Sequence, residues 1–419
     1  MSDEAAFIQE ILANPADREC RLIFADWLEE QGDARGELIR LQVQLEGMAP
    51  DEKGYSTVRK KVRSLEKTVT MFGQLPSQVS KWEHRCGFIE QIELTLTAFL
   101  KHAEDIFANN PVQHAVLRAK SAKLDKIAEL PQLAKLRSLE LRENRLGNDG
   151  LKKLVGAPQM RSLERLTIYS NDITSEGIRE LASMKNLGEL RELRILNNVL
   201  DEGAVEALAT SSVIKKLTRL ELLGVFSNRT WQLLARSDGL RSLTHLLLDS
   251  RGTEGMLSAS GLQEFGQSAF EKPLEELTLT NCIENGIGKG FANTPRLASL
   301  KKLDISWCDL QDSDVQDLVE NLPPVEVLRL EENSIGDDGA KTLAGSPLLE
   351  TLQKLYLTGN IIKLDGVLAL SNSPHRQKKT KFYLGENPLT DKEIKQVGET
   401  VSKSFGNFGR PPTFRAPNW

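Results

Sequence analysis

The sequence of 419 residues has few of the residue types that metal sites and many catalytic sites use. It contains 5 histidines and 4 cysteines. No histidine pair has the i,i+4 spacing or the His-Glu-x-x-His pattern of a metal hydrolase. A zinc site or a disulfide framework needs closely spaced cysteines, whereas Cys20, Cys86, Cys282 and Cys308 lie far apart. The sequence therefore predicts reduced thiols, no metal site and no cofactor.

The sequence also lacks an excess of positive charge and long apolar runs. With 54 Lys and Arg against 59 Asp and Glu, the formal net charge is −5 and the pI is near 5.8, which argues against an electrostatic nucleic-acid binder. No segment approaches the roughly twenty consecutive apolar residues of a membrane-spanning helix. The N-terminal residues MSDEAAFIQEILANP are acidic, unlike the basic start of a secretory signal. We therefore expect a cytoplasmic protein that binds neither nucleic acid nor a membrane.

Leucine is abundant in one part of the chain, and it recurs with a period. There are 8 leucines in residues 1–93 and 57 in residues 94–389. Five segments fit the pattern L-x-x-L-x-L-x-x-N-x-L. These are LRSLELRENRL (136–146), LERLTIYSNDI (163–173), LRELRILNNVL (190–200), VEVLRLEENSI (325–335) and LQKLYLTGNII (352–362).

Alignment on the asparagine of this pattern defines a column that extends through most of the chain. The column contains Asn144, Asn171, Asn198, Val225, Arg251, Cys282, Cys308, Asn333, Asn360 and Asn387, at intervals of 25 to 31 residues. Two weaker units precede it, with Thr97 and Lys120 in the column. The sequence thus predicts about twelve repeats.

Each repeat is expected to contain one short strand and one helix. In the first clear repeat, Leu139 and Leu141 alternate with Glu140 and Arg142, so the leucines should point inward and the charged residues outward. Segments such as SEGIRELASM, after the column position, have helical apolar spacing. Helices are wider than the spacing between strands, so the array should curve with its strands inside. The expected fold class is α/β, a solenoid shaped like a horseshoe with an inner parallel sheet and outer helices.

The column asparagine has an expected structural role. Its amide can both donate to and accept from buried backbone groups where the chain leaves the strand. Cys282 and Cys308 can do so only weakly, and they are expected to be small buried hydrophobic residues. A reactive thiol pair or metal-binding pair in these neighbouring repeats is the alternative.

The repeat pattern resembles the ribonuclease-inhibitor type of leucine-rich repeat over about residues 110–395. The N-terminal segment resembles the repeat-companion domain that precedes repeat arrays in some bacterial proteins. The matching residues are Phe24-Ala25-Asp26-Trp27-Leu28-Glu29-Glu30, Gly32-Asp33 and Arg35-Gly36-Glu37. This resemblance implies no particular activity. The expected organisation is a helical domain (1–48), a helix and linker (49–87), the solenoid (88–389) and a C-terminal helix with a Gly, Pro and aromatic tail (390–419).

The two ends of the chain leave alternatives open. Residues 1–48 have the apolar spacing of helices, and they could cover the open end of the first repeat, as solenoid caps do, or dock a partner. Residues Thr390 to Glu393 form a capping-box pattern that opens a helix. The segment SFGNFGRPPTFRAPNW (404–419) could wrap the last repeat or act as a peptide ligand for another protein or another copy.

Catalytic patterns are weak. The glycine-rich loop Gly286-Ile287-Gly288-Lys289-Gly290 lacks both G-x-G-x-x-G and a G-K-[ST] ending, so a structural role is expected. No Ser, His and Asp set is recognisable, and outward carboxylates such as Glu140 and Asp304 lie about six repeats apart. We therefore expect that the protein is not an enzyme.

Three hypotheses about function follow. The first is a non-enzymatic scaffold or adaptor that binds a protein partner on its concave face. The second is a regulator of a partner enzyme, such as a GTPase-activating or inhibitor protein, because an activator of the Ran GTPase has a similar repeat type. The third is a structural array with no fixed partner. A change in the turnover of a purified partner enzyme would separate the second hypothesis from the first.

Outward positions on the strands predict the binding surface. Two residues before the column, Tyr169, Leu196 and Leu223 fall on adjacent strands, with Leu247 beside them on the next. A weaker group consists of Trp307, Tyr356 and Tyr383. Clustered exposed apolar residues are uncommon on a monomer, and tyrosine with aliphatic neighbours is frequent in binding hot spots. Arg142, Arg194 and Glu221 are expected to form a polar rim around the first group.

Overall fold

The protein is described by a computed structural model, and the described residues are 2–49, 52–70, 72–118, 124–250, 256–281 and 283–393. The chain divides into two compact units. The first contains Met1–Asp172 and Met184–Glu189, and the second contains Ile173–Ser183 and Leu190–Trp419.

Four helices open the first unit, and short polar residues determine where three of them begin. The helices are α1 (Asp3–Ala13), α2 (Arg18–Glu30), α3 (Ala34–Gly47) and α4 (Tyr55–Leu65). The side chains of Ser2, Asp17 and Asp33 accept backbone N–H groups in the first turns of α1, α2 and α3. These bonds satisfy donors that the start of a helix leaves unpaired.

The strands of the first unit form a sheet that begins with a hairpin. They are β1 (Val79–Arg85), β2 (Phe88–Thr95), β3 (His114–Arg118), β4 (Ser138–Arg142) and β5 (Arg165–Tyr169). Strand β1 is antiparallel to β2, whereas β2 to β5 pair in parallel. The helical connections are α5 (Leu96–Asn109), η1 (Leu124–Glu129), η2 (Pro131–Lys135), α6 (Gly147–Gly156), η3 (Pro158–Ser162) and η4 (Lys185–Leu187). The sequence did not predict β1, because its surface-exposed residues carry no leucine pattern.

Helices α1 to α3 pack against the turn of the β1–β2 hairpin and the start of β2. Arg21 of α2 is 2% exposed, pairs with Glu90 of β2, and donates to the carbonyl oxygens of Arg85 at 3.1 Å and Cys86 at 3.3 Å. Burial raises the pKa of Glu90, and Arg21 opposes this shift. The shared apolar core consists of Ile11, Phe24, Ala25, Leu28, Ile39, Phe72 and Phe88. The helices are therefore packed on the first strands of the sheet.

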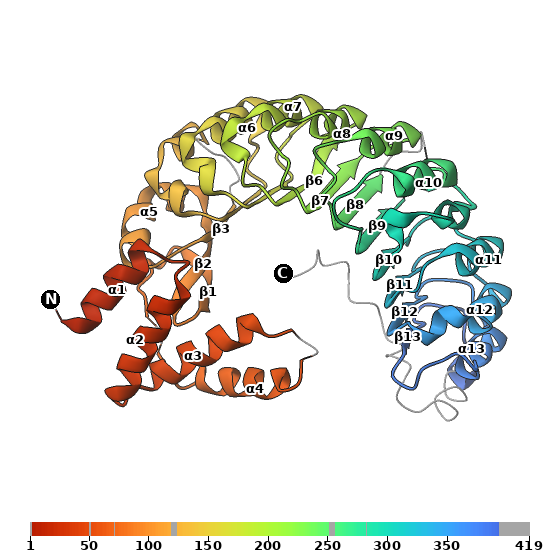
Figure 1. The fold of residues 1–419 in the computed structure, drawn as a ribbon, viewed down its shortest axis with the longest axis horizontal. Coiled ribbons are helices and arrows are strands. Elements are labelled where there is room, and N and C mark those ends of the chain that lie inside the picture. The colour runs from red at the N-terminus through yellow and green to blue at the C-terminus, as the bar shows by residue number, and fades with distance from the viewer. Residues whose placement is uncertain are drawn as a thin grey trace. The chain divides into compact units, whose positions relative to one another are not determined.

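The second unit has parallel strands on one side and helices on the other (Figure 1). Its strands are β6 (Glu192–Leu200), β7 (Arg219–Gly224), β8 (His245–Ser250), β9 (Glu276–Thr280), β10 (Lys302–Asp304), β11 (Val327–Arg329), β12 (Lys354–Tyr356) and β13 (Lys381–Tyr383). Its helices are α7 (Ser175–Ser183), α8 (Glu202–Ala209), α9 (Asn228–Arg236), α10 (Ala259–Gln267), η5 (Ile287–Phe291), η6 (Pro295–Leu297), α11 (Asp312–Asn321), α12 (Asp337–Ala344), η7 (Pro347–Glu350) and α13 (Leu364–Ser371).

Burial alternates along the strands as the repeat pattern predicts. Leu139 and Leu141 are fully buried, whereas Glu140 and Arg142 are partly exposed. The predicted fold class, an α/β leucine-rich repeat solenoid preceded by a small helical region, is confirmed. Among the described residues, strands β2 to β13 supply one strand for each of the twelve expected repeats.

Asparagine side chains join successive repeats where the chain leaves each strand. Nδ2 of Asn360 donates to the carbonyl oxygen of Leu330 at 2.8 Å, and its Oδ1 accepts the N–H of Ile335 at 3.0 Å. Both partners belong to the preceding repeat. Comparable bonds to a preceding repeat are made by Asn144, Asn171, Asn198, Asn333 and Asn387. The structural role predicted for the column is therefore confirmed at these positions.

Three described column positions lack asparagine, and the first of them, Thr97, is exposed within α5. Cys308 is 7% exposed, and its thiol donates to the carbonyl oxygen of Leu279 at 3.2 Å, so sulfur replaces the amide with a weaker donor. Val225 instead is 43% exposed, and the next residue, Phe226, is fully buried. The column residues Lys120, Arg251 and Cys282 lie outside the described residues.

At the C-terminal side of the repeats, the predicted capping box is present. The N–H of Thr390 donates to Glu393 Oε2 at 2.7 Å, and the N–H of Glu393 donates to Thr390 Oγ1 at 3.3 Å. The predicted helix beyond Glu393 and the tail 404–419 lie outside the described residues.

Replacing one column asparagine should destabilise the array. In Asn360→Ala the buried Leu330 carbonyl and Ile335 N–H lose their partners, so we expect the free energy of unfolding to fall by about 2–4 kcal/mol. Urea denaturation followed by circular dichroism measures the change. Asn372→Ala, at an exposed residue after α13, is the control. A loss no larger than that of the control would contradict the assigned role.

Removing residues 1–48 should cause aggregation, because Phe72 and Phe88 would lose the apolar side chains that cover them. Size-exclusion chromatography with light scattering compares the deletion variant with the full chain. A monomeric variant whose melting temperature equals that of the full chain would show that these helices are not a cap.

Candidate functional site

The first predicted apolar group lies on strands at the start of the second unit. Leu196 and Leu223 occupy equivalent positions on β6 and β7, and both are half-buried. Leu247 of β8 is also half-buried, and its register partner is Glu221 of β7, so it lies diagonally from Leu223. Tyr169 ends β5 of the first unit and is half-buried. The three leucines therefore form a small apolar surface on adjacent strands.

The second predicted group contains a stacked pair of tyrosines. Tyr356 and Tyr383 are register partners on β12 and β13, with ring centroids 4.2 Å apart and planes 4° apart. The Arg329 guanidinium lies over the ring of Tyr356, 4.5 Å from its centroid. Burial, followed by the neighbouring Tyr383, raises the pKa of Tyr356 to about 12. Both the aromatic stack and the cation are thus held in place by the sheet.

Trp307 is not part of this stack. It follows β10, whereas Tyr356 lies two strands further on, and its side chain is 50% exposed. Its φ angle of 62° is in the left-handed region, which is unusual for a bulky residue. Its backbone N–H donates to the Glu331 carbonyl oxygen at 3.0 Å. Trp307 is therefore a separate exposed aromatic residue.

The polar rim predicted around the leucines is wrong for Glu221. This residue is 4% exposed, and its carboxylate accepts hydrogen bonds from Arg194 at 2.5 Å and Arg219 at 3.2 Å. Two guanidinium groups from adjacent strands cover the carboxylate, which removes it from solvent. Arg142, in the first unit, pairs with Glu140 of its own strand. The charges beside the apolar residues are thus paired within the sheet.

Glu276 of β9 is the centre of a second charged network. Its carboxylate is 3.6 Å from His245 Nε2 and 3.5 Å from the Arg219 guanidinium, and it also pairs with Lys302. Burial opposes ionisation, but hydrogen bonds from His245 and Lys302 lower the pKa of Glu276 to about 2. Sequence reasoning missed this network. The signal was one carboxylate among basic side chains at equivalent positions of successive repeats: Arg219, His245, Glu276 and Lys302.

A third network lies beside the tyrosines. Arg329 Nε is 3.2 Å from Asp304, and Arg329 also pairs with Glu331. Burial raises the pKa values of Asp304 and Glu331, while Arg329 opposes both shifts. This arrangement places two carboxylates and one guanidinium next to the aromatic stack.

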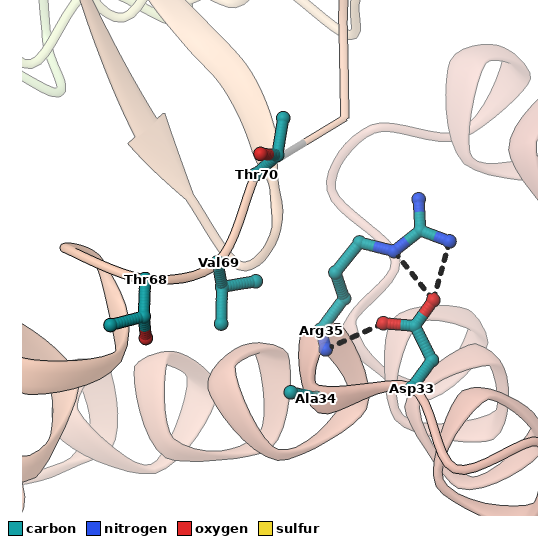
Figure 2. Close-up of a pocket in the computed structure, with 6 residues that line it drawn as sticks. All are labelled: Asp33, Ala34, Arg35, Thr68, Val69 and Thr70. Carbon is teal, nitrogen blue, oxygen red and sulfur yellow. Dashed lines mark hydrogen bonds and ion pairs between the residues drawn. The ribbon is translucent and has the colours of Figure 1, made fainter.

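Other candidate sites have structural explanations. A cleft of about 400 Å³ is lined by Asp33, Ala34, Arg35, Thr68, Val69 and Thr70 (Figure 2). Arg35 Nε donates to Asp33 Oδ2 at 2.8 Å, and its guanidinium pairs with Glu4 at 3.0 Å, so the cation is already engaged. In the glycine-rich loop, a Cβ on Gly288 would lie 2.5 Å from the backbone of Asp317, which explains this glycine by close packing.

Within the described residues, no group of three His, Cys, Asp or Glu side chains is placed to hold a metal ion. No helix in this part of the chain combines the length and apolar character needed to cross a membrane.

The Glu276 network should stabilise the fold in a pH-dependent way. Because the folded pKa of about 2 is below the ordinary 4.5, its contribution is present above pH 4.5 and is lost as the pH falls toward 2. Glu276→Gln should lower the free energy of unfolding at pH 7 by about 1–3 kcal/mol, with a smaller loss near pH 3. Denaturation at several pH values measures this, with Glu275→Gln as the control. If Glu276→Gln lowered the free energy of unfolding by the same amount at every pH, the proposed role of the Glu276 network would be contradicted.

Comparison with known proteins identifies the repeats. Four segments, residues 132–155, 159–182, 296–319 and 321–344, match the model of the leucine-rich repeat family. No curated protein matches the sequence.

The chain is also similar to solved structures. The crystal structure of the Rad7 and Elc1 complex in yeast matches with 16% identity and a TM-score of 0.51, covering 96% of this chain and 91% of that chain. The TLR13–ssRNA13 complex matches with 21% identity and a TM-score of 0.41, covering 67% and 40%. The mouse RP105/MD-1 complex matches with 19% identity and a TM-score of 0.40, covering 71% and 52%. The first match shows a shared fold, and together with the four matched segments it establishes that the chain contains leucine-rich repeats.

Proposed function

We propose that the protein is a non-enzymatic scaffold or adaptor that binds a protein partner on the strand face of its repeats. The proposed contact residues are Tyr169, Leu196, Leu223, Leu247, Trp307, Tyr356 and Tyr383. The observation that carries the proposal is the composition of this face: apolar and aromatic side chains lie partly exposed among charges that already pair with each other.

Internal pairing of the charges favours association. A carboxylate such as Glu221, held by two arginines, keeps its hydrogen bonds when a partner removes water from the surface. The cost of desolvating unpaired charges is thereby avoided, while covering Leu196, Leu223 and Leu247 is favourable. Charges at the edges of the surface would act mainly on the association rate.

The aromatic residues supply a second contact area. Tyr356 and Tyr383 are stacked, so few rotamers remain to be lost on binding, and Trp307 presents a large exposed ring. Tyrosine, tryptophan and arginine are the residue types most frequent in binding hot spots. The likeness to a structure that contains Rad7 and Elc1 is compatible with protein binding, but its 16% identity concerns the fold.

Substitution of the leucines tests the proposal. Leu196→Glu with Leu223→Glu should abolish capture of partner proteins from the source lysate, because two carboxylates would have to be buried at the centre of the interface. Quantitative mass spectrometry of the captured proteins is the measurement. Ile361→Glu, at a residue 56% exposed in a later repeat, is the control.

Circular dichroism must first show that the double variant is folded, because both leucines are half-buried. Trp307→Ser provides a second variant at a residue that is 50% exposed and should reduce capture. If both variants recover the same proteins as the wild type, the strand face is not the binding site. A captured enzyme whose turnover changes on addition of the protein would indicate a regulator instead of a scaffold.

A further inference from the structure

A groove with an apolar floor lies on helices α1 and α2 of the first unit. It has a volume of about 670 Å³ and is open to solvent. Its apolar lining consists of Ala6, Phe7, Cys20, Ile23 and Trp27. The rings of Phe7 and Trp27 are 5.9 Å apart. Neither the repeats nor the proposed contact residues on the strand face contribute to this groove.

The groove lies next to the packed side of α2. Arg21, Phe24, Ala25 and Leu28 of α2 are buried, whereas Ile23 is 58% exposed. Phe7, Cys20 and Trp27 pack against the apolar core with part of their surface and line the groove with the rest. An exposed isoleucine next to two partly exposed aromatic rings forms a contiguous apolar patch.

Carboxylates surround this patch. Asp3, Glu10, Asp17 and Glu19 line the groove, and none of the four makes an ion pair with a described residue. The nearby arginines outside the lining are engaged elsewhere: Arg18 pairs with Glu46 at 3.1 Å, Arg21 pairs with Glu90, and Arg35 pairs with Glu4 at 3.0 Å.

The negative charges of the groove also affect the pKa of the Cys20 thiol. Burial raises its pKa, and the charges of Asp17 and Glu10 raise it further, while Arg21 opposes them. The groove thus combines an apolar floor with a rim whose charge is of one sign.

We propose that this groove is a second docking site, which binds a segment of a partner protein that carries a large apolar side chain flanked by lysine or arginine. The apolar side chain would cover Ile23 and the exposed parts of the Phe7 and Trp27 rings, and the basic residues would meet the carboxylate rim. Opposite charges across an interface increase the association rate and select the partner, whereas the buried anchor supplies most of the affinity. The helical region would then both cover the first strands and dock a partner. This site does not depend on the strand face.

Selection of peptides from a random library tests whether the groove prefers basic peptides with a large apolar side chain. A phage-displayed library of random dodecapeptides is panned against the immobilised full chain at low ionic strength. We expect enrichment of sequences with a net positive charge and at least one Phe, Trp, Leu or Ile. Absence of enrichment, or enrichment of neutral or acidic sequences, would overturn the proposal.

Variants then locate the site. A synthetic, fluorescein-labelled version of the most enriched peptide is titrated with the chain by fluorescence anisotropy. Ile23→Glu should weaken binding at least tenfold, whereas Ile361→Glu, which is similarly exposed, should leave it unchanged. Binding should also weaken as NaCl is raised from 50 to 500 mM, because salt screens the rim charges. Equal binding to the Ile23→Glu variant and the wild type would overturn the proposal.

Two further measurements separate this site from others. Cys20 is partly exposed in the groove, whereas Cys86 and Cys308 are buried, so bound peptide should slow alkylation of Cys20. Unchanged alkylation at saturating peptide would contradict docking here. The Leu196→Glu, Leu223→Glu variant should bind the peptide like the wild type, so a failure of the strand-face proposal and a failure of this one are distinguishable.

Discussion

The structure depends on satisfying the backbone where each strand ends. A strand of only three residues, such as β11 or β12, pairs few N–H and C=O groups, and the next groups along the chain are buried. The column asparagine supplies both a donor and an acceptor at this point, which no apolar residue of similar size can do. Because its partners belong to the preceding repeat, the same side chain also sets the spacing of the array. Strand, turn and helix can then repeat with little change.

The regular part of this architecture could be predicted from the sequence because its causes are local and recur. Leucines at alternating positions, an asparagine after them and a helical segment after that determine one repeat, and the period extends the argument to the others. The β1 strand could not be predicted, since it pairs with β2 without an alternating apolar pattern of its own. The exposure of Ile23 could not be predicted either, because helical periodicity defines an apolar face but not which part of that face the neighbouring elements cover.

The candidate site was predicted in part for similar reasons. Tyr356 and Tyr383 have equal positions in successive repeats, so their contact follows from the alignment alone. Burial of Glu221 does not follow from its own repeat, because it depends on arginines from two strands converging on one carboxylate. To predict such networks from the sequence, equivalent positions of successive repeats must be compared for charge as well as for apolar character.

The absence of the column asparagine at Val225 and Cys308 affects where the second unit unfolds locally. A repeat array approximates a row of coupled segments, and its cooperativity is weakest where the coupling between neighbours is weakest. The thiol of Cys308 and the exposed Val225 provide less coupling than the amides of Asn333, Asn360 and Asn387. The repeats from β11 onward should therefore form one cooperative block, while thermal fluctuations separate neighbouring segments first in the stretch between β7 and β10.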